Sequence, residues 1–432
     1  MSSLDRAKLE SLLDPQTEIS DWEELNPDLQ SQITRAIRND QPSHWLAPST
    51  VEDLSHIVSY ATEMKSSMLL CGNGSKLGWG GLVKQADFVL STQKLNRILD
   101  HAIADLTVTV EAGVKLTDLQ AFLKPHRQFL PIDPSYPEQA TIGGIVATAD
   151  SGSWRQRYGG IRDLVLGCSI VRWDGKIAKA GGKVVKNVAG YDLMKLFTGS
   201  YGTLGVLTQV TFRLYPLPED SKTLLLTGDA QALSQACQDL LKSGLAPTSA
   251  DVLSCNLMRS LELGNNLGLL VRFQNIAESV TEQVDQLQAL GQKLGLSIAE
   301  FTAESEASLW QSLKNQMMPH FNPDLVTCKI GVMSNQIVNF LQESPGLAQI
   351  HLASGLGRLV LTTDSEIEQL SKMRSVCERD RGFLTILEAP KNIKEKHEPW
   401  GYQGNALNLM KSLKTKFDPY NIFNSGCFVG EI

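Results

Sequence analysis

Ala140-Thr141-Ile142-Gly143-Gly144-Ile145-Val146-Ala147-Thr148-Ala149-Asp150-Ser151-Gly152 is the stretch that decides the fold, and it lies inside a longer region from Asp133 to Arg213. Gly, Ala and Ser carry no large side chain, so the backbone of such a stretch can approach a bulky ligand closely. The same density of small residues recurs at 71–81, 181–192 and 199–206. These segments together predict a binding site lined largely by backbone.

Size and charge limit what the chain can do. With 432 residues, 42% of them hydrophobic and 20% charged, the chain is long enough for two or three domains with sizeable cores. The net charge of -7 and the scattered Lys and Arg residues argue against a nucleic-acid partner. Met1 to Glu10 is not a secretory signal, and no segment has membrane-spanning length. We therefore expect a cytoplasmic protein, with any membrane association going through its partners.

The cysteines and histidines give no metal motif. Seven cysteines are widely separated with no Cys-x-x-Cys pair, and seven histidines are equally dispersed. This spacing offers neither an iron–sulfur cluster nor a zinc site, and it favours buried free thiols. If the chain carries electrons, it must therefore pass them to another protein or to a soluble acceptor.

The glycine loop from Gly72 to Gly81 does not fit the common phosphate motifs. It reads G-x-G-x-x-x-G, and a short strand at Phe88–Ser91 follows it instead of a helix, so a Rossmann interpretation loses its context. Backbone N–H groups of the loop can still form an anion-binding nest, with Lys76 nearby to offset charge. The alternative is a glycine-rich surface turn.

Local patterns predict an α+β domain between Pro48 and Pro218. A helix begins after Ser49 or Thr50 as N-cap, and Trp173–Lys176 is a hairpin turn with an Asp-Gly step. The other predicted elements are strands at 68–71, 88–91, 106–110, 164–172 and 204–215 and a helix at 116–123. After Ser221 the sequence predicts helices at 233–241, 280–294 and 308–317 and a strand at 268–273. Trp310 is expected in the core of this second part.

The glycine motifs, taken in chain order, resemble the FAD-binding PCMH-type domain of the vanillyl-alcohol oxidase superfamily. The motifs are Cys71–Gly78, Asp133-Pro134, Ala140–Gly144, Tyr158-Gly159, Arg162-Asp163, Lys186–Leu193 and Gly202–Val206. Within the superfamily, Lys186–Leu193 and the closing Phe417-Asp418-Pro419 with Ile422-Phe423-Asn424 are similar to the E-type FAD-binding subunit of bacterial glycolate oxidase, also called glycolate dehydrogenase. The similarity spans Pro48 to Pro218 and, more loosely, the last thirty residues.

This resemblance implies a fold and its boundaries. The expected fold is α+β, with a two-subdomain PCMH-type FAD-binding domain, an α/β cap domain and a C-terminal tail that returns to the flavin domain. The expected parts are a helical packing extension (1–40), the FAD-binding domain (41–218), the cap domain of antiparallel sheet and helices (219–400) and the C-terminal segment (401–432).

The resemblance also implies the cofactor contacts. The pyrophosphate would be held by Gly72, Asn73, Gly74, Ser75, Lys76, Leu77, Gly78, Thr141, Ile142, Gly143 and Gly144. The remaining contacts would be Pro134, then Thr148, Asp150, Ser151 and Gly152 along the flavin, Gly205 and Val206 at the adenine, and Asn424 from the tail. The chain has Asn424-Ser425-Gly426 where the family has Asn-Pro-Gly, a departure that affects only this turn.

Two features of the glycine loops bear on how FAD is held. Covalent attachment in the superfamily uses a histidine in the first loop or a cysteine in the second, and this chain has neither. We therefore expect noncovalent FAD. Lys183, Lys186, Tyr191 and Asp192 either act in catalysis or form an ion pair and a buried hydroxyl that fix their loop.

The second domain lacks the residues by which relatives oxidise 2-hydroxy acids. Those relatives have a paired-histidine metal site and a Glu-His-Gly segment, whereas this chain has His351–Arg358 and Thr385–Pro390 in the comparable regions. Lys329, His351, Arg358 and Glu388 could form an unusual site, but structural roles are the simpler interpretation. No catalytic residue and no metal ligand is assigned.

Three functions stay open. The resemblance implies a subunit of a glycolate dehydrogenase complex that relays electrons or supports assembly, beside a paralogous FAD subunit and an iron–sulfur subunit, in oxidation of glycolate to glyoxylate. A stand-alone FAD-dependent oxidoreductase on another hydroxy acid or alcohol is the first alternative. A non-catalytic protein with structural FAD is the second.

Overall fold

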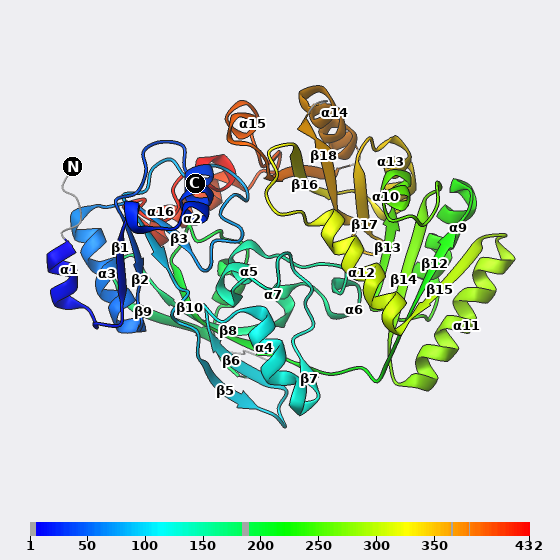
Figure 1. The fold of residues 1–432 in the computed structure, drawn as a ribbon, viewed down its shortest axis with the longest axis horizontal. Helices are drawn as coiled ribbons and strands as arrows, with labels where there is room; N and C mark the ends of the chain where they lie inside the picture. The colour runs from blue at the N-terminus through cyan, green and yellow to red at the C-terminus, as the bar shows by residue number, and fades with distance from the viewer. Residues whose placement is uncertain (1–5, 184–189, 364–365, 380) are drawn as a thin grey trace. The chain divides into compact units, whose positions relative to one another are not determined.

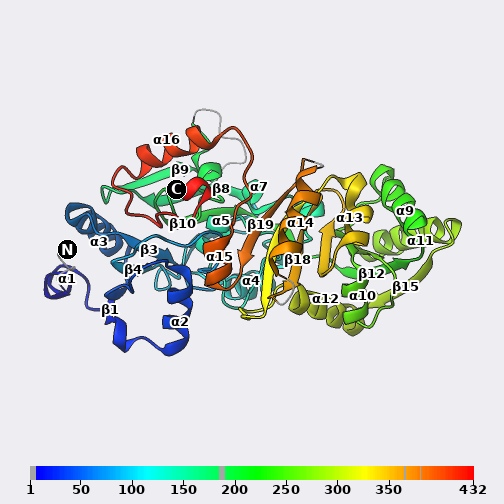
Figure 2. The same cartoon turned by 90° about the horizontal axis from the view of Figure 1, so that it is seen from above.

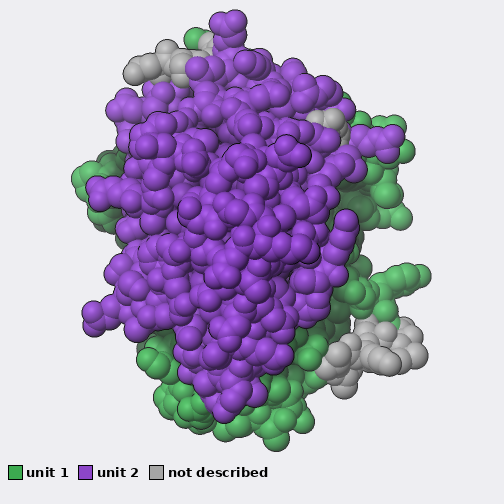
Figure 3. All heavy atoms as spheres, turned by 90° about the vertical axis from the view of Figure 1, so that its right-hand side faces the viewer, with its two compact units in different colours: residues 1–151, 160–217, 394–432 green, residues 152–159, 218–393 purple. Residues whose placement is uncertain are grey.

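A computed structural model describes residues 6–183, 190–363, 366–379 and 381–432. The chain forms two compact units, coloured separately in Figure 3. Unit 1 comprises Met1–Ser151, Gly160–Leu217 and Lys394–Ile432, and unit 2 comprises Gly152–Gly159 and Pro218–Ile393. The sequence predicts domain boundaries after residues 218 and 400, and the two units divide after residues 217 and 393. The short segment Gly152–Gly159, which the sequence analysis assigned to the flavin domain, is grouped with unit 2.

The first sheet of unit 1 has the strand order β1-β2-β4-β3. Its strands are β1 (Glu18–Asp21), β2 (His44–Ala47), β3 (Met68–Cys71) and β4 (Phe88–Ser91), with β2, β4 and β3 parallel and β1 antiparallel to β2. Helix α3 (Val51–Met64) links β2 to β3. The Thr50 side chain accepts a hydrogen bond from the Asp53 N–H at the start of α3, as the N-cap prediction requires.

Residues 1–40 are part of unit 1 and are not purely helical. Helices α1 (Arg6–Leu12) and α2 (Pro27–Ala36) are present, but strand β1 lies between them. Leu9 and Ile33 are almost fully buried in the cores around the first sheet. The expected helical extension therefore also contributes a strand and core side chains to the domain.

The second sheet of unit 1 is antiparallel, with the order β5-β6-β10-β8-β9. Its strands are β5 (Ile98–Ala102), β6 (Thr107–Glu111), β8 (Val165–Val171), β9 (Ile177–Gly181) and β10 (Val206–Arg213). Helices packed on it are α4 (Leu116–Leu123), α5 (Ile142–Thr148), α7 (Ile161–Leu164) and α8 (Leu193–Phe197). The predicted hairpin between β8 and β9 is present, and Gly175 in its turn has φ +74°, which favours glycine.

A buried lysine helps to hold the C-terminal segment in unit 1. Lys414 on helix α16 (Leu407–Phe417) donates hydrogen bonds to the Thr203 and Phe423 carbonyls at 2.9 Å each. Its Nζ also lies 2.5 Å from Asp418 Oδ2. Asp418 in turn accepts hydrogen bonds from the Ile422 and Phe423 N–H groups. The tail therefore folds back onto the loop that precedes β10.

Unit 2 is built on one antiparallel sheet of eight strands in the order β15-β12-β14-β13-β17-β18-β16-β19. The strands are β12 (Asp220–Thr227), β13 (Ser249–Leu253), β14 (Gly268–Asn275), β15 (Ser297–Thr302), β16 (Leu325–Gly331), β17 (Leu347–His351), β18 (Leu356–Thr362) and β19 (Phe383–Glu388). Strands β12–β15 form one half and strands β16–β19 the other, each with the β-α-β-β-α-β connection of the ferredoxin-like fold, to which the first half adds a short helix between β13 and β14. Strands β13 and β17, the second of each half, pair at the seam.

Helices cover the two faces of this sheet unequally. One face carries the main core with α9 (Ala230–Lys242), α11 (Ala277–Lys293), α13 (Ile337–Glu343) and α14 (Glu366–Arg379). The other face packs on α10 (Cys255–Ser260) and α12 (Ala303–Met317). Figures 1 and 2 show α9 and α10 on opposite sides of the strands. Trp310 of α12 packs on the second core and donates its indole N–H to Thr223 Oγ1 at 2.9 Å.

Candidate functional site: the pocket of unit 1

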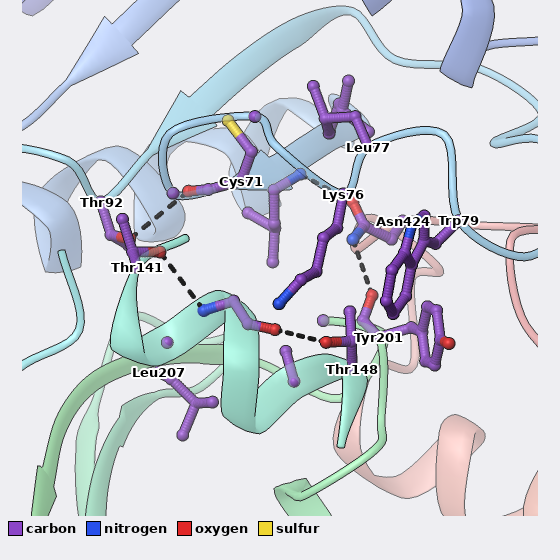
Figure 4. A pocket seen from close by; sticks show the side chains of 18 of the residues that line it. Cys71, Lys76, Leu77, Trp79, Thr92, Thr141, Thr148, Tyr201, Leu207 and Asn424 are labelled. Atoms are coloured by element: carbon purple, nitrogen blue, oxygen red, sulfur yellow. Dashed lines mark hydrogen bonds between the residues drawn. The ribbon is translucent and has the colours of Figure 1, made fainter. Parts of the chain in front are cut away.

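A pocket of unit 1 lies between the loop after β3, the start of α5 and the loop before β10 (Figure 4). It encloses about 910 Å³ of space including its open mouth. Its lining includes thirteen of the expected cofactor residues: Gly72, Asn73, Gly74, Ser75, Lys76, Leu77, Thr141, Gly143, Gly144, Thr148, Gly205, Val206 and Asn424. The glycine segments that are distant in the sequence therefore share one cavity.

The first glycine loop and the start of α5 pack tightly against each other. A Cβ added at Gly72 would lie 2.0 Å from Thr141 Oγ1, so only glycine fits there without a shift. Thr141 is the N-cap of α5, and its hydroxyl accepts a hydrogen bond from the Gly144 N–H at 3.4 Å. At Gly144 an added Cβ would have a single neighbour, Thr141 Oγ1 at 3.3 Å. Gly144 therefore borders open pocket space, whereas Gly72 serves the packing of the loop.

Lys76 brings a positive charge into the pocket. Its side chain is 5% exposed and runs from the loop toward α5 in Figure 4. Lys76 Nζ lies 3.0 Å from Asp150 Oδ2 and 5.4 Å from the centre of the Trp79 ring. The Asp150 carboxylate also accepts a hydrogen bond from the Ser135 N–H at 2.8 Å. Asp150 is thus joined to the pocket through its ion pair with Lys76, although it is not among the lining residues.

Asn424 joins two walls of the pocket. Its side-chain oxygen accepts a hydrogen bond from the Leu70 N–H at 2.6 Å, and its Nδ2 donates to the Tyr201 carbonyl at 2.8 Å. Its φ of 42° is in the left-handed region, which Asn tolerates better than most residues. Both ends of the amide are used by backbone groups. Asn424 therefore positions the end of β3 and the loop before β10.

The other expected cofactor residues lie outside the lining. Ile142 is fully buried in the core beside the second sheet, and the Gly78 carbonyl accepts a hydrogen bond from Lys394 Nζ. Ser151 Oγ accepts from the Ile161 N–H at 3.0 Å, and Gly152 is grouped with unit 2. Pro134 is also absent from the lining.

Thirteen residues that line the pocket were not named as individual cofactor contacts. Seven of them lie in the small-residue segments predicted to line a binding site: Cys71, Trp79, Ala140, Ala147, Ser200, Tyr201 and Gly202. The six that lie outside these segments are Leu69, Leu70, Val83, Thr92, Leu207 and Cys427. Most of the thirteen are neighbours of expected residues, so their position next to a glycine motif was a usable signal. Cys427 comes from the tail, and only the expected return of the tail could have pointed to it. Burial raises the pKa of Cys71 and of Cys427 to about 12, so both are neutral thiols near pH 7.

The loop around Tyr191 gives a mixed outcome. Lys183 Nζ lies 2.9 Å from Asp100 Oδ2, and Lys195 Nζ lies 2.7 Å from Asp192 Oδ2. Tyr191 is 89% exposed, so the expectation of a buried hydroxyl at this position is wrong. Lys186 lies outside the described residues.

A polar cluster of side chains lies at the seam of the unit 2 sheet. His351 on β17 is the cross-strand partner of Asp251 on β13, and His351 Nδ1 lies 2.6 Å from Asp251 Oδ1. Asp251 Oδ2 accepts hydrogen bonds from Ser153 Oγ at 2.6 Å and from Gln349 Nε2 at 2.9 Å. The four residues are each more than nine-tenths buried. They link both halves of the sheet with the segment Gly152–Gly159.

The other three residues considered for a catalytic site are on neighbouring strands. Lys329 on β16 is the register partner of Arg358 on β18, which is also opposite Gln349 on β17. Glu388 on β19 is opposite Thr327. Within the described residues, no three or more His, Cys, Asp or Glu side chains are grouped to hold a metal ion.

No helix in the described part of the chain has both the length and the apolar character that crossing a membrane requires.

Comparisons with known proteins support the binding of FAD by this chain. Residues 42–181 match the family model described as an FAD binding domain. Glycolate oxidase subunit GlcD of Bacillus subtilis (strain 168) is 28% identical over 419 residues, which cover 89% of this chain and 88% of that protein. Glycolate oxidase subunit GlcE of Escherichia coli (strain K12) is 28% identical over 382 residues, which cover 87% of this chain and 96% of that protein.

Solved structures share the fold. A p-cresol methylhydroxylase with substrate bound superposes with a TM-score of 0.71 at 15% identity, covering 98% of this chain and 95% of that one. The chain therefore has the fold of PCMH-type proteins, with an FAD-binding domain of two sheets and a second α/β domain. FAD is its cofactor, and the matched domain is typical of FAD-dependent oxidoreductases.

Proposed function

We propose that this chain is the FAD-binding subunit of a 2-hydroxy-acid dehydrogenase of the glycolate oxidase kind. In this proposal it takes part in oxidation of glycolate to glyoxylate beside a paralogous FAD subunit and an iron–sulfur subunit, as an electron relay or an assembly subunit. The observation that carries the proposal is similarity along nearly the whole chain to two different glycolate oxidase subunits, GlcD and GlcE. Similarity to both subunits fits a chain that works beside a paralogue.

The pocket of unit 1 is the proposed FAD site. Gly74 and Gly144 line the pocket without side chains in the way, which suits close approach of a pyrophosphate. Open space at the Gly144 Cβ position supports this fit. The Lys76 ammonium offsets phosphate charge in part, since it is shared with Asp150. When bound, FAD supplies the acceptor for two electrons.

The proposed FAD is noncovalent. No histidine lines the pocket among the described residues. The thiolate is the nucleophilic form of cysteine, and burial keeps Cys71 and Cys427 as thiols. A Cys71→Ser/Cys427→Ser variant should therefore retain FAD that acid releases, as the wild type does.

An electron-accepting partner is part of the proposal. No disulfide joins the seven cysteines, and no three or more His, Cys, Asp or Glu side chains are grouped to hold a metal ion in the part of the chain that the structure describes. An iron–sulfur partner would supply the one-electron carriers that the chain does not provide.

Anaerobic absorbance at 450 nm tests this proposal. The FAD-loaded chain is mixed with glycolate or D-lactate, alone and with copurified partner subunits. Bleaching that requires the partners is the expected result. If neither substrate bleaches the flavin under either condition, a role in oxidising 2-hydroxy acids is refuted.

A second candidate is a chain that oxidises a hydroxy acid or alcohol at a site of its own. The buried His351–Asp251 pair favours it, since catalytic bases are often held in this way. Bleaching of the isolated chain by glycolate or D-lactate would support this candidate over the relay.

A further inference from the structure

The first glycine loop of unit 1 contains the one Asn-Gly step of the sequence, Asn73-Gly74. Both residues line the pocket. The backbone nitrogen that follows an asparagine can attack the carbon of the side-chain amide, and a glycine hinders this attack least because it has no Cβ. Whether the attack occurs in a folded protein depends on how firmly the nitrogen and the amide are held.

The protein does not hold the backbone nitrogen of Gly74. Among the described residues its N–H has no hydrogen-bond partner, although the Gly74 carbonyl accepts a hydrogen bond from the Leu77 N–H at 3.1 Å. Gly74 has a φ of +77°, and an added Cβ would lie 2.9 Å from Gln32 Oε1, so the loop requires glycine at this position. Water or a ligand must satisfy an N–H of this kind. In the FAD-free chain the nitrogen is therefore available for reaction.

The Asn73 side chain is held by a single long hydrogen bond within the described residues. Its Nδ2 donates to the Gln139 carbonyl at 3.3 Å, at an exposed position, and this distance is longer than is usual for N–H···O bonds. Gln139 is itself exposed. The amide of Asn73 can therefore turn toward the Gly74 nitrogen at little cost.

Two comparable steps in unit 1 are held much more firmly. In the one Asp-Gly step of the sequence, Asp174-Gly175, the glycine N–H donates to the Arg172 carbonyl at 2.9 Å, and the carboxylate accepts from the Arg172 guanidinium at 3.1 Å. Asn424, which precedes Ser425, has both ends of its amide in hydrogen bonds to backbone groups. Asn73 differs from both, because neither its amide nor the nitrogen that follows it is fixed in this way.

We propose that Asn73 is a site of spontaneous deamidation in the FAD-free chain and that the product binds FAD less tightly. The Gly74 nitrogen forms a bond to Asn73 Cγ, and the Cγ–Nδ2 bond breaks. The proton of the Gly74 nitrogen leaves with the amide group as ammonia. Water then opens the cyclic imide at either of its carbonyl groups, which leaves an aspartate or an isoaspartate in place of Asn73. No oxidant or reductant takes part in these steps.

The product changes the charge of the pocket wall and, as isoaspartate, also its backbone. A carboxylate replaces a neutral amide in a lining whose one charged side chain is Lys76, and a carboxylate repels the negative pyrophosphate of FAD. Isoaspartate adds a methylene group to the main chain directly after Gly72, where an added Cβ would lie only 2.0 Å from Thr141 Oγ1. The loop has no room for such a shift without disturbing the start of α5.

Bound FAD should protect the loop, because a loop in contact with a ligand is less free to bring the two reacting groups together. The chain therefore keeps its binding site while it holds FAD and loses the site gradually while it does not. This inference rests on the assignment of FAD to the pocket of unit 1, and it holds whichever substrate the chain oxidises.

Peptide mass spectrometry tests the modification itself. The full chain is incubated in mildly alkaline buffer with and without saturating FAD, and the peptide that contains Asn73 is sampled over time, with isoaspartate detected by enzymatic methylation. Loss of the Asn73 amide should be faster without FAD than with it, whereas the peptide that contains Asn424 should stay unchanged in both samples. An Asn73 amide that survives as long as that of Asn424, or that is lost equally fast with FAD bound, would overturn the proposal.

Titration with FAD tests the consequence for binding. Asn73→Asp introduces the carboxylate directly and should raise Kd about 5-fold or more, since two like charges in contact repel to this extent even in water. Asn73→Gln keeps an amide but forms the larger cyclic imide much more slowly, so its Kd should not drift during incubation as that of the wild type does. Deamidated wild-type protein that binds FAD as tightly as fresh protein refutes the proposal, even if Asn73→Asp fails to fold. Fresh wild-type protein that binds no FAD refutes the assignment of the pocket as well.

Discussion

Replacing Gly144 by Ala should affect cofactor binding and protein stability in opposite directions. The position lies in helix α5 without a positive φ, so Ala can adopt its backbone conformation. The new Cβ would meet only Thr141 Oγ1, at 3.3 Å. Such a Gly→Ala change stabilises the folded protein by about 0.4–1 kcal/mol. The apo protein should therefore unfold at the same temperature as the wild type or slightly above it.

The same methyl group should weaken FAD binding because it occupies pocket space at the proposed pyrophosphate contact. An extra methyl group in a closely packed contact costs about 1–3 kcal/mol, which corresponds to a rise in Kd of about 5- to 150-fold. The assay is titration of apo protein with FAD, followed by quenching of flavin fluorescence. Unchanged affinity in a variant of normal stability would refute close approach of the cofactor at Gly144.

Gly143→Ala is the matched control for this prediction. Its Cβ would lie 2.8 Å from Ala112 Cβ and 3.1 Å from the Ala112 carbonyl oxygen, so it points into the protein. Overpacking of this kind destabilises by about 1–3 kcal/mol. Gly143→Ala should therefore lower the unfolding temperature of the apo protein, which Gly144→Ala should not.

Three further predictions concern stability. Asn424→Ala leaves two backbone groups without their amide partner and should cost about 2–4 kcal/mol, measured by urea denaturation; a loss below about 0.5 kcal/mol would contradict the positioning role. Burial lowers the pKa of Lys414 below 10.5, so the unfolded chain binds this proton more tightly than the folded chain. The free energy of unfolding of the wild type, relative to that of Lys414→Met, should therefore rise as the pH approaches 10.5. If this difference in free energy does not change with pH, the ammonium is not buried. The pKa values of Cys71 and Cys427 are raised from 9.0 to about 12, so their contribution to stability is present below pH 9 and lost toward pH 12; replacing both by Ser should reduce the alkaline loss of stability seen in thermal melts.

Features set by neighbouring residues could be predicted from the sequence. The Thr50 cap, the strand Met68–Cys71 and the Asp-Gly turn near Gly175 each depend on a few adjacent side chains and their backbone preferences. The series of glycine motifs predicted which segments line the pocket, because close approach requires small residues wherever the segments come from. The segments at Gly72, Gly144 and Gly205 indeed share one cavity.

Features that depend on pairing across long distances could not be predicted in this way. Asp251 and His351 are 100 residues apart, and only the antiparallel pairing of β13 with β17 brings them together. Strand β1 has four half-buried residues without apolar alternation, so its pattern does not distinguish it from a loop. Lys76 and Asp150 lie in two loops that are far apart in the sequence and meet only in the folded protein. The sequence of neither loop indicates that the two side chains form an ion pair.

Acid precipitation of FAD-loaded protein tests directly whether the pocket of unit 1 holds FAD noncovalently. Purified chain is saturated with FAD, freed of excess cofactor and precipitated with trichloroacetic acid, and the flavin is measured in the pellet and the supernatant. The expected result is one FAD per chain, all of it in the supernatant, and a smaller amount retained by Gly144→Ala under the same conditions. Flavin that remains in the pellet would contradict noncovalent binding, and protein that holds no FAD before precipitation would contradict the assignment of the pocket.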